Sequence, residues 1–234
     1  MMPMGRLIRR AVWMSMPWTF PNHGRSRGEH GSWTMEDCLS SINTVAKHIK
    51  AETGLPVFLL GSSQGSAFAW YGLNTSDAVT GAITLCLAAF HLSPFRDVIA
   101  PLRSDEFVAA MKFFRGSLQI DLKKFMRIEE NYGSKEITDR LLADPDMTWV
   151  YDLAAYRELL LWEPANPASQ NTKPLFVTVG EHDPFMPPAV VKMIADQIAG
   201  PVTYHKFKDA PHQVMLERTD EFIAAVDDWV ASVS

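Results

Sequence analysis

The stretch that decides the fold runs from Val57 to Gly72 and reads VFLLGSSQGSAFAWYG. A short apolar run leads into a turn of small residues, and a run that is compatible with a helix follows. The pentapeptide Gly61–Gly65 fits the pattern G-x-S-x-G, which is typical of a sharp turn from a strand into a helix. Its two glycines lack a Cβ atom, so that the strand and the helix can approach closely. Ser63 stands at the apex in a strained backbone conformation, with its hydroxyl pushed out of the sheet, and we predict that it is a nucleophile.

A plain turn between a buried strand and a helix is the alternative interpretation, because small residues are common and the pentapeptide recurs by chance. The context favours the nucleophile, since an apolar run ends at Gly61 and Ala67–Tyr71 can continue as a helix. The N-terminus of that helix would supply backbone N–H groups and a positive potential where an oxyanion forms.

The composition is that of an ordinary globular protein. The chain has 234 residues, of which 47% are hydrophobic and 21% charged, enough for one large α/β domain with a sizeable core. A net charge of −5 without a Lys/Arg tract gives no indication of a nucleic-acid partner. No apolar run reaches the ~18 residues of a membrane span, and the apolar stretch before Pro17 lacks a signal-peptide cleavage site, so we expect a cytoplasmic protein. Cys38 and Cys86 lie in apolar segments and are predicted to pack as small hydrophobic side chains without a disulfide.

Short strands alternate with helices along the chain, which predicts a mostly parallel sheet with helices on both faces. We expect strands at residues 11–16, 57–60, 79–87, 175–180 and 202–207, and helices at 35–53, 67–71, 189–198 and 214–233. Thr34 is the expected N-cap of the first of these helices, because Asp37 follows three residues later, and Gly54 is expected to end that helix. A turn is expected at Gly72 and at residues 74–77.

The pattern changes at Phe90, and until about Pro167 the chain consists of mixed helical segments rich in aromatic residues. We predict that residues 90–167 form a helical cap, inserted into an α/β core made of residues 1–89 and 168–234. The aromatic side chains either pack a core or line an apolar substrate pocket under the cap, and the sequence leaves both interpretations open.

Ser63, Asp183 and His212 each follow a predicted strand. The carboxyl ends of parallel strands lie on one edge of the sheet, where ligands gather. His212 would take the proton from Ser63, and Asp183 would hold the imidazole in the required tautomer. Taken alone, Asp183 could cap a turn and His212 could be a surface histidine, but the order Ser, Asp, His at strand ends favours a catalytic triad. No second ligand at helical spacing accompanies His182 or His205, so no metal site is predicted.

These features resemble the α/β-hydrolase superfamily, and within it the group of monoacylglycerol lipases, lysophospholipases and serine aminopeptidase-like enzymes. The motifs that carry the resemblance are Pro21–Ser26 (PNHGRS), Gly31–Asp37 (GSWTMED), the turn around Ser63, Gly180–Pro184 (GEHDP) and Pro211–His212. The resemblance implies a serine esterase that needs no cofactor, with Ser63, Asp183 and His212 as its triad. It also implies that the backbone N–H of Gln64 is one donor of the oxyanion hole.

The sequence departs from this family at its N-terminus. Members carry three more strands before the motif at His23–Gly24, and the turn after the third holds the second oxyanion donor. Nothing in the chain matches that turn, so the second donor is unknown and the chain resembles an N-terminally truncated hydrolase. Because the missing third strand would lie beside the nucleophile strand, we expect residues 11–16, or a second copy of the chain in a homodimer, to cover an open edge there.

Two functional hypotheses follow. The first is a serine hydrolase that cleaves lipid-like acyl esters, such as monoacylglycerols or lysophospholipids, through an acyl-enzyme. Small-ester carboxylesterases and aminopeptidase-like enzymes are alternatives that the sequence does not separate from it. The second hypothesis is a truncated, weakly active or non-catalytic scaffold, because the loss of one oxyanion donor typically costs ~100- to 1000-fold in turnover.

Overall fold

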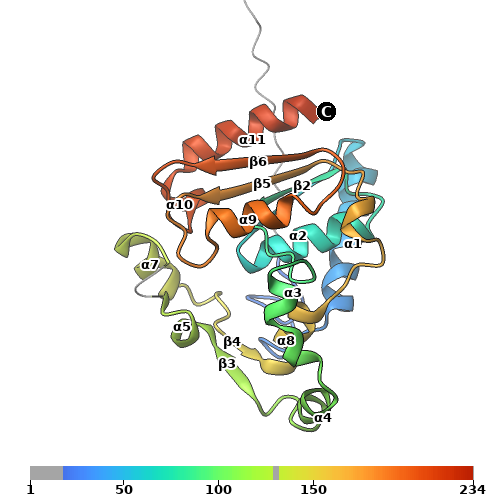
Figure 1. Ribbon diagram of the computed structural model, residues 1–234, viewed down its shortest axis with the longest axis vertical. Coiled ribbons are helices and arrows are strands. Elements are labelled where there is room, and N and C mark those ends of the chain that lie inside the picture. Colours follow the sequence, from blue (N-terminus) through green and yellow to red (C-terminus); the bar gives the residue numbers. More distant parts are fainter. Residues whose placement is uncertain (1–17, 129–131, 234) are drawn as a thin grey trace, which may run out of the picture.

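Four parallel strands form the central sheet of the structure, a computed structural model that describes residues 18–128 and 132–233. The strands, hydrogen-bonded in the order β1-β2-β5-β6, are β1 (Phe58–Ser62), β2 (Gly81–Leu85), β5 (Leu175–Gly180) and β6 (Val202–Phe207) (Figure 1). Every pairing between these strands is parallel, with Ser62 opposite Leu85 and Gly180 opposite Phe207. The carboxyl ends of the strands therefore meet at one edge of the sheet, as predicted.

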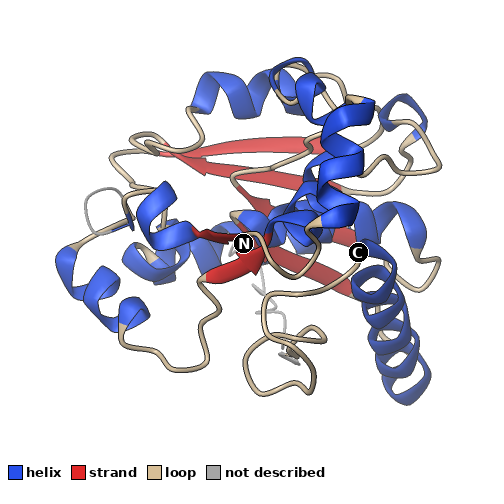
Figure 2. Ribbon diagram, turned by 90° about the horizontal axis from the view of Figure 1, so that it is seen from below, coloured by secondary structure: helices blue, strands red, loops and turns tan. Residues whose placement is uncertain are grey.

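Helices cover both faces of this sheet, whose strands lie between α11 above and α9 and α2 below in Figure 1; Figure 2 shows the sheet from below. One face carries α1 (Met35–Thr53), α2 (Gln64–Thr75) and α9 (Pro188–Ala195), and the other carries α11 (Thr219–Val233). Trp229 of α11 stacks on Phe176 of β5, with ring centroids 5.3 Å apart. Every residue of β2 and β5 is buried, because both strands are covered on two sides.

The caps of α1 lie where the sequence predicts them. Thr34 Oγ1 accepts the backbone N–H of Asp37 at 3.1 Å. At the other end, Gly54 has a left-handed φ of 67° and donates its N–H to Lys50 O at 2.9 Å. Between these caps the helix buries one stripe, which includes Cys38 and Ile42, against the rest of the core.

Two predicted boundaries are wrong because a single residue leaves the regular conformation. β2 ends at Leu85 and not at residue 87, since Cys86 has a left-handed φ of 58° that a strand does not continue. The C-terminal helix is divided into α10 (Val214–Glu217) and α11, because Arg218, with φ −132° and ψ 47°, is not helical.

A third correction concerns Gly72, which does not begin a turn. α2 continues through it to Thr75. A Cβ atom on Gly72 would lie 2.9 Å from both Ile42 and Leu59, so this glycine lets α2 pack closely against α1 and β1.

The segment 90–167 contains helices, as predicted, and also a two-stranded antiparallel sheet that was not predicted. Its elements are α3 (Phe95–Val98), the 3-10 helix η1 (Ala100–Arg103), α4 (Asp105–Phe113), β3 (Gln119–Asp121), α5 (Leu122–Phe125), α7 (Lys135–Leu142), β4 (Val150–Asp152) and α8 (Leu153–Leu161). Ile120 of β3 pairs with Tyr151 of β4. Figure 1 shows these elements below the central sheet. A second 3-10 helix, η2 (Ala168–Gln170), leads back to β5. The division of the chain into core and cap stays a prediction.

β1 is the terminal strand of the sheet among the described residues. Leu60 in this strand is 53% exposed, whereas Leu59 and Gly61 are buried. The strand predicted at residues 11–16 lies outside the described part of the chain, so closure of this edge by that strand or by a second copy stays a prediction. Within residues 18–128 and 132–233, no helix combines the length and the apolar character needed to cross a bilayer.

Candidate active site

Ser63 occupies the turn between β1 and α2 in the strained conformation that its sequence pattern predicts. Its φ of 53° and ψ of −123° lie outside the regions that residues with a side chain normally adopt, and its N–H donates to Leu85 O at 3.0 Å. Such a conformation persists only where the surrounding structure enforces it, and it is enriched at functional sites. The side chain is half-buried and stands at the N-terminus of α2, whose first residue is Gln64.

The two glycines of the pentapeptide have different roles. A Cβ atom on Gly61 would lie 2.1 Å from Gly65 O and 2.9 Å from Ala69 Cβ, so only glycine lets β1 pass this close to α2. Nothing lies within 4 Å of a Cβ atom placed on Gly65. The expectation that both glycines serve close approach is therefore correct for Gly61 and wrong for Gly65.

The buried hydroxyl of Ser66 ties this turn to the end of β2. Its proton is shared between Ser63 O at 2.6 Å and Cys86 O at 2.9 Å, and its oxygen accepts the N–H of Ala88 at 2.9 Å. The sequence analysis missed this residue, although its place one turn after Ser63 on the same helix was a signal. These bonds hold the predicted nucleophile against the carboxyl end of the neighbouring strand.

Asp183 and His212 form a buried pair beyond the ends of β5 and β6. His212 Nδ1 lies 2.8 Å from Asp183 Oδ2. His212 is 0% exposed and Asp183 is 5% exposed. Asp183 Oδ1 accepts the backbone N–H groups of Phe185 and Met186 at 2.9 Å each. Burial acts to raise the pKa of Asp183, but its hydrogen bonds and the charge of His212 outweigh burial and lower that pKa below its ordinary value. A carboxylate only accepts hydrogen bonds, so Nδ1 carries a proton, and in the neutral imidazole Nε2 therefore carries the lone pair.

The structure joins Asp183 to His212 but does not join Ser63 to them by a hydrogen bond. His212 Nε2 is buried and has no hydrogen-bond partner among the described residues. The link from Ser63 Oγ to Nε2 therefore stays a prediction. Hydrogen bonds between catalytic groups are often long without substrate and tighten in the complex, so this geometry does not argue against the assignment.

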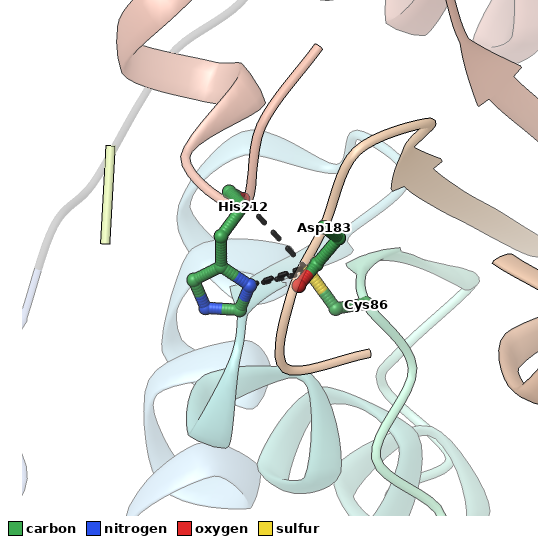
Figure 3. Close-up of side chains that lie close together, drawn as sticks. All are labelled: Cys86, Asp183 and His212. Atoms are coloured by element: carbon green, nitrogen blue, oxygen red, sulfur yellow. Dashed lines mark hydrogen bonds and ion pairs between the residues drawn. The ribbon is translucent and has the colours of Figure 1, made fainter. Parts of the chain in front are cut away.

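Cys86 contacts all three of these residues, which the sequence analysis did not predict. Its Sγ lies 3.5 Å from His212 Nδ1 and 3.9 Å from His212 O, and it also lies beside the Asp183 carboxylate (Figure 3). The backbone N–H of Ser63 is a further neighbour of this sulfur. Burial and the charge of Asp183 raise the pKa of the Cys86 thiol well above its ordinary value, so the thiol is neutral. Cys38 and Cys86 are both free and buried, as expected. Cys86 is nevertheless part of the site, and its position directly after a buried strand was the signal for this.

Aromatic side chains cover His212. The ring of Tyr132, from the segment 90–167, lies 5.5 Å from the imidazole, and the ring of Phe185 lies 4.8 Å from it in an edge-on arrangement. Tyr132 in turn contacts Trp149 at 6.2 Å. Burial raises the pKa of Tyr132 to about 12, so its hydroxyl stays protonated at neutral pH. The site is therefore closed on this side by apolar ring surface.

Two cavities are lined mainly by residues of the segment 90–167. One, of about 200 Å³, lies between α4 and α8 and includes Met111 and Ala154 in its lining. The other, of about 460 Å³, lies beside strands β3 and β4 and includes Lys123 and Trp149, together with His30 from outside the segment. Neither is lined by Ser63, Asp183 or His212. Trp149 connects the second cavity to the rings over His212, since it also contacts Tyr132.

The strained serine between a strand and a helix, and the buried Asp–His pair at later strand ends, lie on one parallel sheet. A family model described as the Alpha/beta hydrolase family matches residues 6–225. The chain belongs to the alpha/beta hydrolase family. The fold class predicted from the sequence is thereby confirmed. No curated protein sequence matches this hydrolase.

Solved structures with a similar fold include several hydrolases. A monoacylglycerol lipase from Paleococcus ferrophilus is 21% identical with a TM-score of 0.68, over 92% of this chain and 82% of that one. A thermophilic esterase from Thermogutta terrifontis is 20% identical with a TM-score of 0.59, over 92% and 78% of the two chains. Alpha/beta hydrolase domain-containing protein 10 from mouse is 17% identical with a TM-score of 0.59, over 92% and 76%. At these identities the likeness shows the fold alone.

Proposed function

We propose that this hydrolase cleaves carboxylic esters, with Ser63 as nucleophile, His212 as general base and Asp183 as the residue that orients the base. The observation that carries the proposal is the buried Asp183–His212 pair, with Nδ1 and Oδ2 2.8 Å apart. Cys86 Sγ lies 3.5 Å from His212 Nδ1, and the backbone N–H of Ser63 donates to the carbonyl oxygen of Leu85, the residue before Cys86; these contacts support placing the serine at the same edge of the sheet. The chemistry of ester hydrolysis needs these three groups in these roles.

The tautomer of His212 determines which nitrogen can accept the proton of Ser63. Its Nδ1–H donates to Asp183, so the Nε2 lone pair is free to accept the Ser63 proton as Oγ attacks the ester carbonyl carbon. The imidazolium that forms is stabilised by the Asp183 charge and returns its proton to the leaving alcohol. Water then cleaves the acyl-enzyme by the same route. The N–H of Gln64, at the positive end of α2, is the proposed donor to the oxyanion.

We expect the substrate to be an uncharged or lipid-like ester with a medium to long acyl chain. Tyr132, Trp149 and Phe185 present apolar ring surface next to His212, and such surface favours an acyl chain over a charged group. The likeness to a monoacylglycerol lipase and to an esterase agrees with this class. A series of p-nitrophenyl esters tests it, and a strong preference for acetate over octanoate would contradict it.

A fluorophosphonate probe tests the nucleophile directly, because it forms a covalent bond to an activated serine. We expect labelling of the wild-type chain and none of Ser63→Ala. Ser62→Ala is the matched control, since Ser62 is the neighbouring serine and its buried hydroxyl has no partner among the described residues. It should be labelled like the wild type. A wild-type chain that is folded but not labelled would favour the non-catalytic scaffold.

A further inference from the structure

Cys86, Asp183 and His212 bring three metal-ligand atoms within 4.8 Å of one another. The residues come from the loops after β2, β5 and β6, and their side chains point toward one another (Figure 3). A thiolate, a carboxylate and an imidazole nitrogen are the ligand types that zinc takes in proteins. No pair of metal ligands on one helix accompanies His182 or His205, so the sequence predicts no metal site. The ligands Cys86, Asp183 and His212 come together only at the edge of the folded sheet.

The distance between Cys86 and His212 fits a tetrahedral ion, and the distance between Asp183 and His212 is somewhat short for one. Bonds of about 2.3 Å to sulfur and about 2.0 Å to nitrogen, at a tetrahedral angle, place those two atoms about 3.5 Å apart. Cys86 Sγ and His212 Nδ1 are 3.5 Å apart. Asp183 Oδ2 and Nδ1 are 2.8 Å apart, so this pair has to open by about 0.5 Å to take up the ion. We propose that Cys86, Asp183 and His212 bind a thiophilic divalent cation such as Zn²⁺, and that the bound ion switches off hydrolysis.

Activity is lost because the bound ion changes which nitrogen of His212 carries the proton. The ion binds Nδ1 through its lone pair, so the Nδ1 proton has to leave and the neutral imidazole carries its proton on Nε2 instead. Nε2 then has no lone pair with which to accept the Ser63 proton. The Cys86 thiol gives up its proton to solvent as the sulfur–metal bond forms, and no electron is transferred. One proton is released overall for each ion bound.

Charge favours the bound form. The three side chains carry a net charge of −1 without the ion, from Asp183, and zero with the ion and the Cys86 thiolate. A buried charge is thereby neutralised, which is favourable in a site from which water is excluded.

Metal binding is measured first, without substrate. Co²⁺ is titrated into the full chain, and the sulfur-to-cobalt absorption band and the released protons are recorded. We expect the band in the wild type and in Cys38→Ala, the matched control with the other buried thiol removed. We expect no band in Cys86→Ala, or in Cys86→Ser should the alanine variant not fold. A wild-type chain without the band, or a band that survives the loss of Cys86, would overturn the proposal.

Inhibition is measured second, with Zn²⁺ and a p-nitrophenyl ester after incubation to equilibrium, because the three donors are buried. Each variant is compared with its own metal-free rate. The inhibition constant should be more than ~10-fold higher in Cys86→Ala than in the wild type, because one of the three ligands is removed. Equal inhibition of the wild type and Cys86→Ala would overturn the proposal that the ion bound at this site switches off hydrolysis. This part rests on the proposed function: a cobalt band without any wild-type turnover refutes the esterase and leaves the metal site, whereas turnover without a band does the reverse.

Discussion

Protonation of His91 should weaken the fold below neutral pH, and the structure sets the size of the effect. His91 is 9% exposed, its ring lies parallel to Trp70 at 6.3 Å, and neither ring nitrogen has a hydrogen-bond partner among the described residues. Burial lowers the pKa of His91 to about 4, against opposing attraction from Glu163 and with a smaller repulsion from Arg96. A charged imidazole is therefore poorly tolerated at this position.

The sign and magnitude follow from proton linkage. The unfolded chain binds a proton at this residue below pH ~6.5, whereas the folded chain binds it only below about 4. The stabilisation is thus complete above pH ~6.5 and is lost as the pH falls toward 4. The full difference corresponds to about 3 kcal/mol, of which about 2 kcal/mol is already lost at pH 5.

Urea unfolding at pH 8 and pH 5 measures this loss. His91→Phe keeps a flat ring without a titrating group, so its free energy of unfolding should fall between the two pH values by about 2 kcal/mol less than that of the wild type. His48→Gln is the matched control, because His48 is exposed on α1, and it should behave like the wild type. Identical losses in the wild type and His91→Phe would refute the reasoning.

Three further predictions concern the site and its scaffold. Asp183→Asn should lower kcat ~10⁴-fold at unchanged fold, since an amide that donates toward Nδ1 of His212 selects the wrong tautomer; steady-state kinetics and circular dichroism check this. Gly61→Ala should destabilise the chain and abolish activity because its Cβ meets backbone at 2.1 Å, whereas Gly65→Ala meets nothing and should raise the thermal midpoint or leave it unchanged. Thr34→Ala should cost about 1 kcal/mol in urea unfolding through loss of the α1 cap, and an unchanged midpoint would contradict the role of the 3.1 Å cap bond.

Much of the core could be predicted because its signals are local. Apolar runs, the Thr34 cap and the G-x-S-x-G pattern each depend on a few neighbouring residues. The parallel sheet then follows from alternating strands and helices, and it places Asp183 and His212 together without any knowledge of their contacts. The same argument could not predict whether Ser63 Oγ lies within hydrogen-bond distance of His212 Nε2. The end of a strand fixes the position of the following loop only to within several ångströms, which is too coarse to predict a hydrogen bond.

Packing between distant segments explains most of the errors. Gly72 has the composition of a turn, but the space between Ile42 and Leu59 keeps it inside a helix. Strands β3 and β4 have three residues each, too few for a period of two to show in the sequence, and residues 122–149 separate them along the chain. Gly65 matches its pattern as well as Gly61 does, and only the folded backbone shows that one of them is sterically required.

Cys86 shows how one backbone rotation moves a residue from the core into the site. Residues 79–87 are almost uniformly apolar, so nothing in their sequence indicates where the strand ends. The strand ends where the Cys86 N–H donates to Thr178 O at 2.7 Å and its carbonyl oxygen accepts from Ser66, two partners far away in the sequence. With φ at 58°, the side chain turns toward Asp183 and His212 instead of continuing the alternation of the strand. A nucleophilic residue directly after a buried strand should therefore be treated as a candidate site residue before it is assigned to the core.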